Sequence, residues 1–339
     1  MIKALVLTNM YPSSRYPAWG TFIADQVKSL QSSVSVTVVQ QTRKSSIGIF
    51  LFLIKSMWSC LTYNYDIIHA HYGFHSAIIP LLLKRSPIVV SFHGSDALIE
   101  PKRNRIYDFL QRWVVKHATC IVAVGEHLKT HLINEMGANR ERIIVIPCGV
   151  DTDQFILRDK MAVRKKLNLN DKSKIVLFIG RQTQAKGVDL LRNAASQFPE
   201  VQFYFIGEYG IRWTAANCTF VGVIPHSIIH DWINAADILV LPSLSEGTPV
   251  TVLESLASET PVVCTNVGSC PSLVSEGVTG LLIPPQNISA LTEAIHAGLY
   301  TTQFRMKEGR TLVLNGYSLN ESAKKLISVY ERALKGVIQ

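Results

Sequence analysis

Residues 239–254, with the sequence LVLPSLSEGTPVTVLE, decide the fold of this chain. The apolar residues 238–241 predict a buried strand, and the segment from Pro249 onward predicts a helix. Thr248 is the expected N-cap, with Pro249 at the first helical position. Gly247 allows a sharp turn between the two elements. The stretch is therefore typical of one strand–loop–helix unit of a parallel sheet.

The same stretch carries two candidate site residues. Free N–H groups at such a helix start attract anions, phosphate above all. Glu246 lies in the loop and Glu254 lies inside the helix, so their carboxylates are expected about 10 Å apart along the axis. That separation is close to the span from a sugar, across a diphosphate, to a ribose. A capped helix with two surface acids gives the same pattern, so this stretch alone leaves both interpretations open.

Apolar runs alternate with helical stretches along the whole chain, which indicates parallel sheets covered on both faces. We predict two doubly wound, Rossmann-like α/β domains that face each other, residues 1–150 and 151–319, and a C-terminal helix within 320–339 that packs back on the first domain. The expected strands are 2–8, 34–39, 67–70, 88–92, 120–124 and 143–146, then 175–179, 201–206, 219–221, 238–241, 261–265 and 281–283.

Composition excludes several classes of protein. With 47% hydrophobic and 17% charged residues the chain is globular, and no apolar run reaches the ~18 residues that span a bilayer. Six scattered cysteines without a CxxC pair predict a reduced, cytoplasmic protein. The net charge of +9 is compatible with nucleic acid, an anionic membrane or a phosphorylated substrate, but no nucleic-acid-binding signature accompanies it. The chain also has no GxGxxG after its first strand, no Walker A sequence and no GxSxG, which argues against a dehydrogenase, a P-loop NTPase and a hydrolase.

A basic loop, residues 180–187 (GRQTQAKG), follows a predicted strand and opens a helix. Arg181 offers a planar fork and Lys186 a point charge, which together suit a diphosphate. A solvated basic loop is the alternative. We favour the first interpretation because these residues follow a strand of the same sheet as Glu246 and Glu254.

Histidines end two strands of the first half. His93 comes directly after the predicted strand 88–92, where it could bond a sugar hydroxyl or be a structural residue oriented by Asp96. His69 and His71 could share one face of a strand, but no carboxylate or cysteine nearby completes a metal site. We expect no metal.

Two further features of the first half have both a functional and a structural interpretation. The loop 9–20 is long for a strand–helix connection, and Gly20 at its end can approach a bulky ligand. Two apolar-basic stretches could lie on anionic lipid or could be core helices with solvated basic loops. The basic residues concerned are Arg43 and Lys44 before the apolar stretch 47–58, and Lys102, Arg103 and Arg105.

These residues together resemble a retaining GT-B glycosyltransferase, most similar to the large family 4 group. The resemblance covers nearly the whole chain and rests on the order and spacing of its motifs. They are NMYP at 9–12, DIIHAH at 66–71, FHGSD at 92–96, VIPCGVD at 145–151, GRQTQAKG at 180–187, the two glutamates of 246–254, and TGLL at 279–282.

The resemblance implies transfer of a sugar from a nucleotide diphosphate donor with retention at the anomeric carbon, without a metal or another cofactor. It assigns Arg181 and Lys186 to the departing diphosphate and Glu246 to the hydroxyls of the donor sugar. Glu254 would hold the ribose, His93 would reach the sugar from the opposite domain, and the leaving group itself would accept the proton. The other residues expected to bind the donor are Gly20, Val223, Gly247, Thr248, Val250 and Thr251.

Some positions depart from the family pattern and leave donor and acceptor details open. The donor-side loop has one glycine, Gly20, where many members have two; Ser272 stands where a glutamate is common, and Gln182 replaces an aliphatic residue. A nucleotide-sugar 2-epimerase on the same scaffold would need further acid/base carboxylates, which we cannot identify in the sequence. A non-catalytic nucleotide-sugar-binding protein is the other alternative, and the intact charged residues argue against it.

We therefore expect a hexosyltransferase that uses a UDP- or GDP-linked sugar and acts on a saccharide or lipid-linked saccharide in surface polysaccharide or glycolipid biosynthesis. The basic first half is the reason to expect such an acceptor. The predicted location is cytoplasmic, with peripheral attachment to the inner face of the cell membrane as a further hypothesis.

Overall fold

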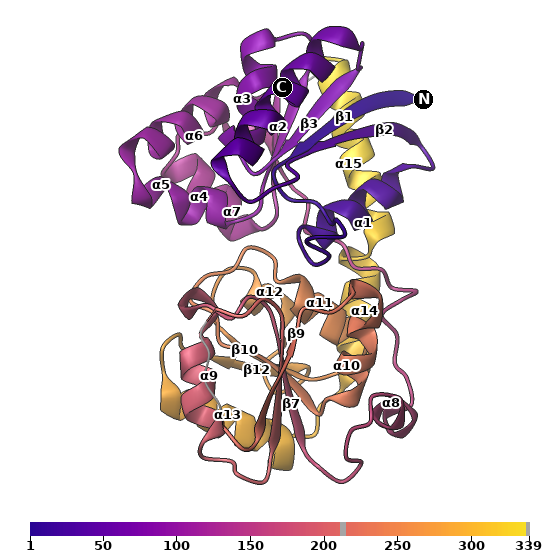
Figure 1. Cartoon of the computed structure of the whole chain (residues 1–339), viewed down its shortest axis with the longest axis vertical. Coiled ribbons are helices and arrows are strands. Elements are labelled where there is room, and N and C mark those ends of the chain that lie inside the picture. Colours follow the sequence, from indigo (N-terminus) through magenta and orange to yellow (C-terminus); the bar gives the residue numbers. More distant parts are fainter. Residues whose placement is uncertain (211–214, 337–339) are drawn as a thin grey trace. The chain divides into compact units, whose positions relative to one another are not determined.

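The computed structural model describes residues 1–210 and 215–336, apart from the side chains of Lys102 and Arg103. The chain divides into two compact units, Met1–Gly149 with Leu319–Gln339, and Val150–Ser318 (Figure 1). Residues 337–339 of the predicted C-terminal helix lie outside the described part. Each unit is built on one sheet and has its own hydrophobic core.

The first unit is built on a six-stranded sheet of order β2-β1-β3-β4-β5-β6, and every neighbouring pair is parallel. Its central strands are buried on both faces, which is why they appear in the sequence as continuous apolar runs. The strands are β1 (Ile2–Thr8), β2 (Val34–Gln40), β3 (Ile67–His71), β4 (Ile88–Phe92), β5 (Cys120–Ala123) and β6 (Ile143–Val145). The helices are α1 (Thr21–Leu30), α2 (Ser46–Thr62), α3 (Phe74–Leu83), α4 (Ser95–Leu98), α5 (Glu100–Arg103), α6 (Arg105–His117), α7 (Glu126–Asn134) and the short turn η1 (Arg140–Arg142).

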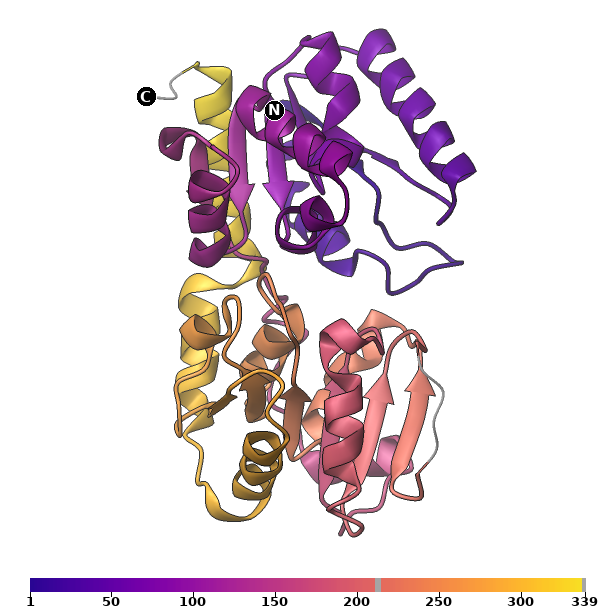
Figure 2. The ribbon, with the colours of Figure 1, turned by 90° about the vertical axis from the view of Figure 1, so that its left-hand side faces the viewer.

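The C-terminal helix α15 (Leu319–Leu334) belongs to this first unit, although the whole second unit precedes it in the sequence. It runs beside the sheet and contacts α1, β3 and β4 (Figure 2). Leu326, Val329 and Tyr330 are buried in one cluster with Ile67 and Val89 of the central strands. Burial of this apolar face holds the end of the chain on the first sheet.

The second unit repeats the design with a six-stranded sheet of order β12-β11-β10-β7-β8-β9, again parallel throughout. The strands are β7 (Ile175–Ile179), β8 (Gln202–Ile206), β9 (Cys218–Gly222), β10 (Ile238–Leu241), β11 (Val262–Thr265) and β12 (Gly280–Ile283). The helices are α8 (Lys160–Lys166), η2 (Gln184–Lys186), α9 (Val188–Ala195), η3 (His226–Ile228), α10 (Ile229–Ala235), α11 (Val250–Ala257), α12 (Cys270–Leu273), α13 (Ile288–His296), η4 (Ala297–Thr301) and α14 (Met306–Gly316).

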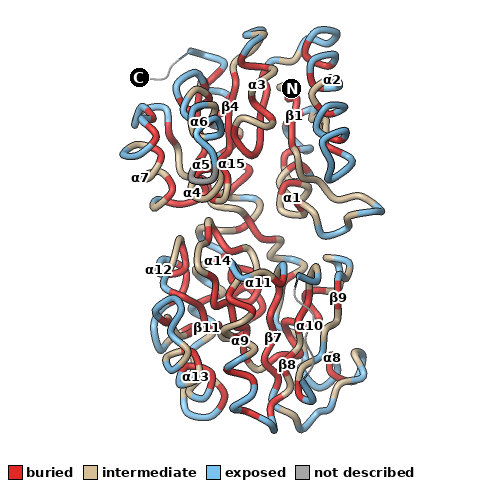
Figure 3. Tube along the Cα trace, turned by 60° about the vertical axis from the view of Figure 1, so that its left-hand side comes forward, coloured by how far each residue is buried: buried red, intermediate tan, exposed pale blue. Residues whose placement is uncertain are grey.

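Burial follows this layered plan in each unit (Figure 3). Inner strands such as β4, β7 and β10 are buried throughout, whereas the edge strands β2 and β9 are only partly buried. Most helices turn one face to the sheet and one to solvent. The predicted α/β class with two doubly wound parallel sheets is confirmed, and each predicted strand is present within one or two residues of its expected ends.

One predicted helix start is wrong. We expected Thr248 as the N-cap of α11 and Pro249 as its first residue, but the helix begins at Val250 and Pro249 occupies the cap position. Pro249 keeps an extended conformation, with φ −72° and ψ 102°, so the chain is not yet helical there. The ring of proline fixes φ but leaves ψ free to be helical or extended, so Pro249 does not by itself start the helix.

Candidate functional site

Two loops of the second unit meet at the carboxyl edge of its sheet. Strands β7 and β10 are neighbours, so the loops that follow them lie side by side. The backbone N–H of Leu244 donates to the carbonyl of Ala185 at 2.9 Å and fastens one loop to the other. Gly187 has φ +69°, and a Cβ there would lie 1.9 Å from the carbonyl oxygen of Pro242, so only glycine fits this contact. This is the edge at which open α/β sheets bind ligands.

Lys186 and Glu246 form an ion pair at this junction. Lys186 Nζ lies 2.6 Å from Glu246 Oε1, and the side chains are 27% and 7% exposed, respectively. The structure thus brings together a cation expected at the diphosphate and a carboxylate expected at the sugar. Arg181 is exposed in the same loop, and its guanidinium pairs with no carboxylate in the described part of the chain. In this loop, among the described residues, Lys186 is therefore paired with a carboxylate, whereas Arg181 is not.

A third loop holds the backbone beside Glu246. The N–H of Ser269 donates to the carbonyl of Gly247 at 3.1 Å. Gly268 has φ +59°, and a Cβ at this residue would come within 2.3 Å of the carbonyl oxygen of Glu246. Gly268 was not among the predicted site residues. The only feature of the sequence that points to it is its position after strand β11, at the same edge of the sheet.

The predicted phosphate-binding residues lie at the N-terminus of α11. Val250 and Thr251 are half-buried there, and no residue in the described ranges accepts a hydrogen bond from either backbone N–H. Gly247 is half-buried and Thr248 is nearly buried in the preceding loop. Free N–H groups at a helix start carry a partial positive charge, so the end of the helix can receive an anion.

Glu254 lies deeper in α11 and is bonded to His226, which was not among the predicted site residues. Its Oε1 lies 2.7 Å from Nε2 of His226, with side chains that are 3% and 23% exposed. His226 begins η3, which follows β9, so the contact joins two segments 28 residues apart. No motif in the sequence marks such a contact.

Val223 and Gln182 flank this edge in different ways. Val223 follows β9 and is 41% exposed, and the ring of Tyr209 lies against the preceding Gly222. Gln182 is fully buried; its backbone N–H donates to Glu208, and its side-chain amide has no partner within the described residues. The departure from the family pattern at this position thus places a polar amide in the interior of the loop.

His93 lies at the carboxyl end of β4 in the first unit, with both its ring and its backbone held. Asp96 accepts hydrogen bonds from the backbone N–H groups of His93 and Gly94, at 3.0 and 2.9 Å. His93 Nε2 lies 3.0 Å from His71 Nδ1, while its Nδ1 is buried without a partner among the described residues. Asp96 therefore orients the backbone of His93, and His71 orients its imidazole.

Burial shifts the pKa of His93 and the pKa of Asp96 in opposite directions. It lowers the pKa of His93 to about 3. It raises the pKa of Asp96 to about 7, against the two backbone hydrogen bonds, which act in the opposite direction. His93 is thus neutral at pH 7, and its imidazole can donate or accept a proton in a hydrogen bond.

The neighbouring His69 is hydrogen-bonded at both nitrogens of its ring. His69 Nδ1 lies 2.7 Å from Tyr330 Oη of α15, and its Nε2 lies 2.7 Å from Ser91 Oγ. Within residues 1–210 and 215–336 no group of three or more histidine, cysteine, aspartate or glutamate side chains could hold a metal ion. Burial lowers the pKa of His69 to about 3.

Gly20 closes the loop after β1 and is the N-cap of α1. It has φ +70°, and a Cβ there would lie 2.6 Å from the carbonyl oxygen of Met10. The position therefore needs glycine for packing within its own loop, whatever else it contacts.

Comparison with known proteins identifies the family. Residues 7–154 match the family described as Glycosyltransferase Family 4, and residues 159–305 match Glycosyl transferases group 1. The chain is a GT-B glycosyltransferase of group 1. The expectation of a transferase enzyme is confirmed.

Relatives and solved structures extend along most of this glycosyltransferase. TuaC of Bacillus subtilis, a putative teichuronic acid biosynthesis glycosyltransferase, is 28% identical over 87% of this chain and 88% of its own. A D-inositol 3-phosphate glycosyltransferase of Kribbella flavida is 26% identical over 79% of this chain and 72% of its own.

Two solved structures share the fold. Sucrose-phosphate synthase from Thermosynechococcus elongatus has a TM-score of 0.82 at 20% identity, with 99% of both chains covered. HepE of Anabaena, in complex with UDP and glucose, has a TM-score of 0.79 at 18% identity, with 97% of this chain and 99% of that chain covered.

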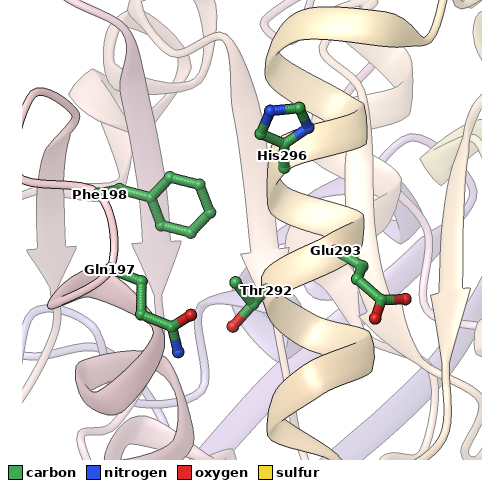
Figure 4. Close-up of a pocket in the computed structure, with 5 residues that line it drawn as sticks. All are labelled: Gln197, Phe198, Thr292, Glu293 and His296. Atoms are coloured by element: carbon green, nitrogen blue, oxygen red, sulfur yellow. The ribbon is translucent and has the colours of Figure 1, made fainter.

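A hollow elsewhere in the second unit of the glycosyltransferase contains none of the predicted site residues (Figure 4). Gln197 and Phe198 follow α9 on one side of it, and Thr292, Glu293 and His296 come from α13 on the other. The edge that carries Lys186 and Glu246 therefore remains the candidate site.

Proposed function

We propose that this glycosyltransferase transfers a sugar from a UDP- or GDP-linked donor, with retention, to a saccharide or lipid-linked saccharide acceptor of surface polysaccharide or glycolipid biosynthesis. The observation that carries the proposal is the Lys186–Glu246 pair at the carboxyl edge of the second sheet, next to the exposed Arg181. Membership of a glycosyltransferase family and relatives named for teichuronic acid and inositol phosphate support it.

In the proposed reaction the bond between the anomeric carbon and the β-phosphate oxygen breaks, and an acceptor oxygen bonds to that carbon on the same face. The acceptor proton passes to the departing phosphate. Arg181 and Lys186 stabilise the negative charge that develops on this group, and Glu246 accepts hydrogen bonds from donor sugar hydroxyls. The N-terminus of α11 binds a phosphate through the N–H groups of Val250 and Thr251.

Three other predicted residues keep their proposed roles. Glu254 binds the ribose hydroxyls, and the backbone around Val223 contacts the base. His93 remains a proposed catalytic residue of the first unit. The proposal requires no metal, because in the proposed mechanism Arg181, Lys186 and the N-terminus of α11 supply the positive charge for the departing diphosphate.

The first experiment is a thermal-shift screen of the purified protein against UDP- and GDP-linked sugars. A ligand that binds the folded protein raises the melting temperature by mass action. Donors that stabilise the protein are then assayed for release of the nucleoside diphosphate with candidate saccharide acceptors. If no nucleotide sugar stabilises the protein or turns over, the proposed donor class is wrong.

We further propose that the first unit docks on an anionic membrane surface. Across residues 1–210 and 215–336, no helix is both long and apolar enough to cross a bilayer. Helix α2 nevertheless exposes a row of large apolar side chains, including Phe50 at 62%, Trp58 at 60% and Ile47 at 64%. Exposed apolar surface of this kind is typical of an interaction site. The exposed basic residues near it are Arg43, Lys44, Lys55, Lys84 and Arg85.

The predicted basic cluster of α5 and α6 is described only in part, because the side chains of Lys102 and Arg103 lie outside the described ranges. Arg105 is exposed, and Ile106 and Phe109 of the same helix are both 66% exposed. Apolar insertion by α2 together with basic residues matches the chemistry of an anionic bilayer.

Liposome co-sedimentation tests the membrane proposal. Binding should be stronger to anionic than to zwitterionic vesicles and should weaken with salt, since each basic residue near such a surface contributes about 1 kcal/mol. The double variant Phe50→Ser/Trp58→Ser should bind less, whereas Tyr300→Ser/Leu314→Ser, which removes exposed apolar residues of the second unit, should not. Binding that does not depend on lipid charge or on salt concentration contradicts the proposal.

A further inference from the structure

His226 holds a carboxylate that is nearly buried. Its Nε2 lies 2.7 Å from Oε1 of Glu254, and the two side chains are 23% and 3% exposed. An ionised carboxylate can only accept hydrogen bonds, so Nε2 of His226 carries the proton that it donates to Glu254. Burial of a carboxylate costs free energy unless such bonds compensate it. His226 therefore helps to hold the Glu254 side chain in one orientation.

His226 is itself held by the segment that opens the second unit. Gln154 Nε2 donates to the carbonyl of His226 at 3.2 Å, and the ring of Phe155 lies 5.5 Å from the imidazole. Phe155 is 1% exposed, so this ring contact is part of the core. Gln154 thus holds the backbone of His226, and Phe155 packs near its imidazole.

Arg310 of α14 ties this segment to α11. Its Nη1 donates to the carbonyls of Phe155 and of Ala257, the last residue of α11. The helix that carries Glu254 and the segment that supports His226 are therefore connected through one guanidinium. This connection helps to fix the distance between Nε2 of His226 and the carboxylate of Glu254.

We propose that His226 is a positioning residue that makes the donor site selective for ribonucleotides. With one edge of the Glu254 carboxylate bonded to His226, the carboxylate is held so that it accepts hydrogen bonds from the 2′- and 3′-hydroxyls of a ribose. A carboxylate that rotated freely would meet these hydroxyls less well and would distinguish ribose poorly from 2′-deoxyribose. This inference rests on the proposed function, in which Glu254 binds the ribose.

The test compares binding of UDP with 2′-deoxy-UDP, and of GDP with 2′-deoxy-GDP, by calorimetry on the full chain. The wild type should bind the ribonucleotide more tightly by roughly 10-fold, the scale of one hydrogen bond to a charged group. His226→Leu should reduce this preference to near unity. His226→Gln should retain much of it, because its amide can donate to Glu254 from about the same place.

Turnover provides a second readout. His226→Leu should raise the donor KM and leave kcat nearly unchanged, since a ribose contact is equally strong in the ground and transition states. The matched control is His296→Leu, which removes an exposed imidazole from α13 and should retain the wild-type preference. Melting temperatures of all variants establish that they are folded.

The outcomes separate this inference from the proposed function. If the wild type binds neither UDP nor GDP, the nucleotide-donor proposal fails and the inference fails with it. If the wild type prefers the ribonucleotide and His226→Leu keeps that preference, only the inference is overturned. Equal loss of affinity for the ribo- and deoxyribonucleotide in His226→Leu, without rescue by His226→Gln, would assign His226 a purely structural role and also overturn it.

Discussion

Lys186 Nζ lies 2.6 Å from Glu246 Oε1, so two residues with separate proposed tasks are bonded to each other. Glu246 is only 7% exposed, and the ammonium compensates a carboxylate that would otherwise be nearly buried and alone. A diphosphate that binds Lys186 competes for the same ammonium. Lys186 and Glu246 are therefore paired with each other before a donor binds, and the proposed donor contacts would compete with this pairing.

The first prediction concerns this competition. Glu246→Gln removes the charge that holds Lys186 and the negative charge near the incoming diphosphate. We expect the variant to bind UDP or GDP a few-fold more tightly than the wild type, while kcat falls because a contact to the sugar is lost. Calorimetry and steady-state kinetics measure the two effects. If nucleotide affinity does not rise, Lys186 is not limited by its pairing with Glu246.

The second prediction separates the residues that stabilise charge from the one that binds ribose. Arg181→Ala and Lys186→Ala should each lower kcat by ~10²-fold or more, the scale for loss of one preorganised electrostatic donor. Arg181→Lys should also be impaired, because lysine lacks the two-pronged geometry. Glu254→Ala should mainly raise the donor KM. Near-normal turnover in both alanine variants of the cations would contradict the proposed mechanism.

The third prediction is that turnover survives EDTA. In the proposed mechanism Arg181, Lys186 and the N-terminus of α11 stabilise the negative charge of the departing diphosphate, so turnover should need no divalent cation. The measurement compares turnover in EDTA with turnover in Mg²⁺ and in Mn²⁺ at equal ionic strength. Activity that disappears in EDTA and returns with either metal would refute the prediction.

How far the sequence predicts this fold depends on burial. Strands such as β3 and β4 are covered on both faces, so they appear as uninterrupted apolar runs that are easy to find. The start of α11 was predicted wrongly, because Pro249 suits both a first helical residue and an extended cap, and the sequence does not distinguish them.

Some features of the candidate site could likewise be predicted from the sequence, and others could not. Lys186 and Glu246 could be placed at one edge because the strands before them follow the pattern of a parallel sheet. The contact of His226 with Glu254 could not be predicted, since it depends on where η3 lies relative to α11 and joins residues 28 positions apart. The bond between His71 and His93 has the same origin: it needs the register of β3 against β4.

The fourth prediction tests whether His93 acts on the substrate. Asp96 and His71 already hold its backbone and ring, so replacement of the imidazole removes a group with a fixed orientation. His93→Ala should lower kcat far more than it lowers affinity for UDP or GDP. The comparison needs kinetics with donor and acceptor alongside nucleotide binding. Similar losses in both quantities would indicate that His93 is structural.

The last prediction concerns stability against pH. Burial lowers the pKa of His69 to about 3, whereas an unfolded histidine titrates near pH 6.5. The stability that neutral His69 contributes is therefore fully present above about pH 6.5 and is lost progressively as the pH falls towards 3. At pH 5 the loss amounts to about 2 kcal/mol.

Asp96 acts in the opposite direction, because its pKa is raised to about 7 and its contribution is lost as the pH rises through that value. The variant His69→Gln isolates the contribution of His69 to the pH dependence, because the amide can still bond Tyr330 or Ser91 but does not titrate. Urea unfolding at pH 7.5 and 5.0 should show a drop in the free energy of unfolding that is about 2 kcal/mol smaller in His69→Gln than in the wild type. His296→Gln, which removes an exposed imidazole, should keep the wild-type drop. An unchanged drop in His69→Gln would mean that His69 is not held neutral by burial in the folded protein.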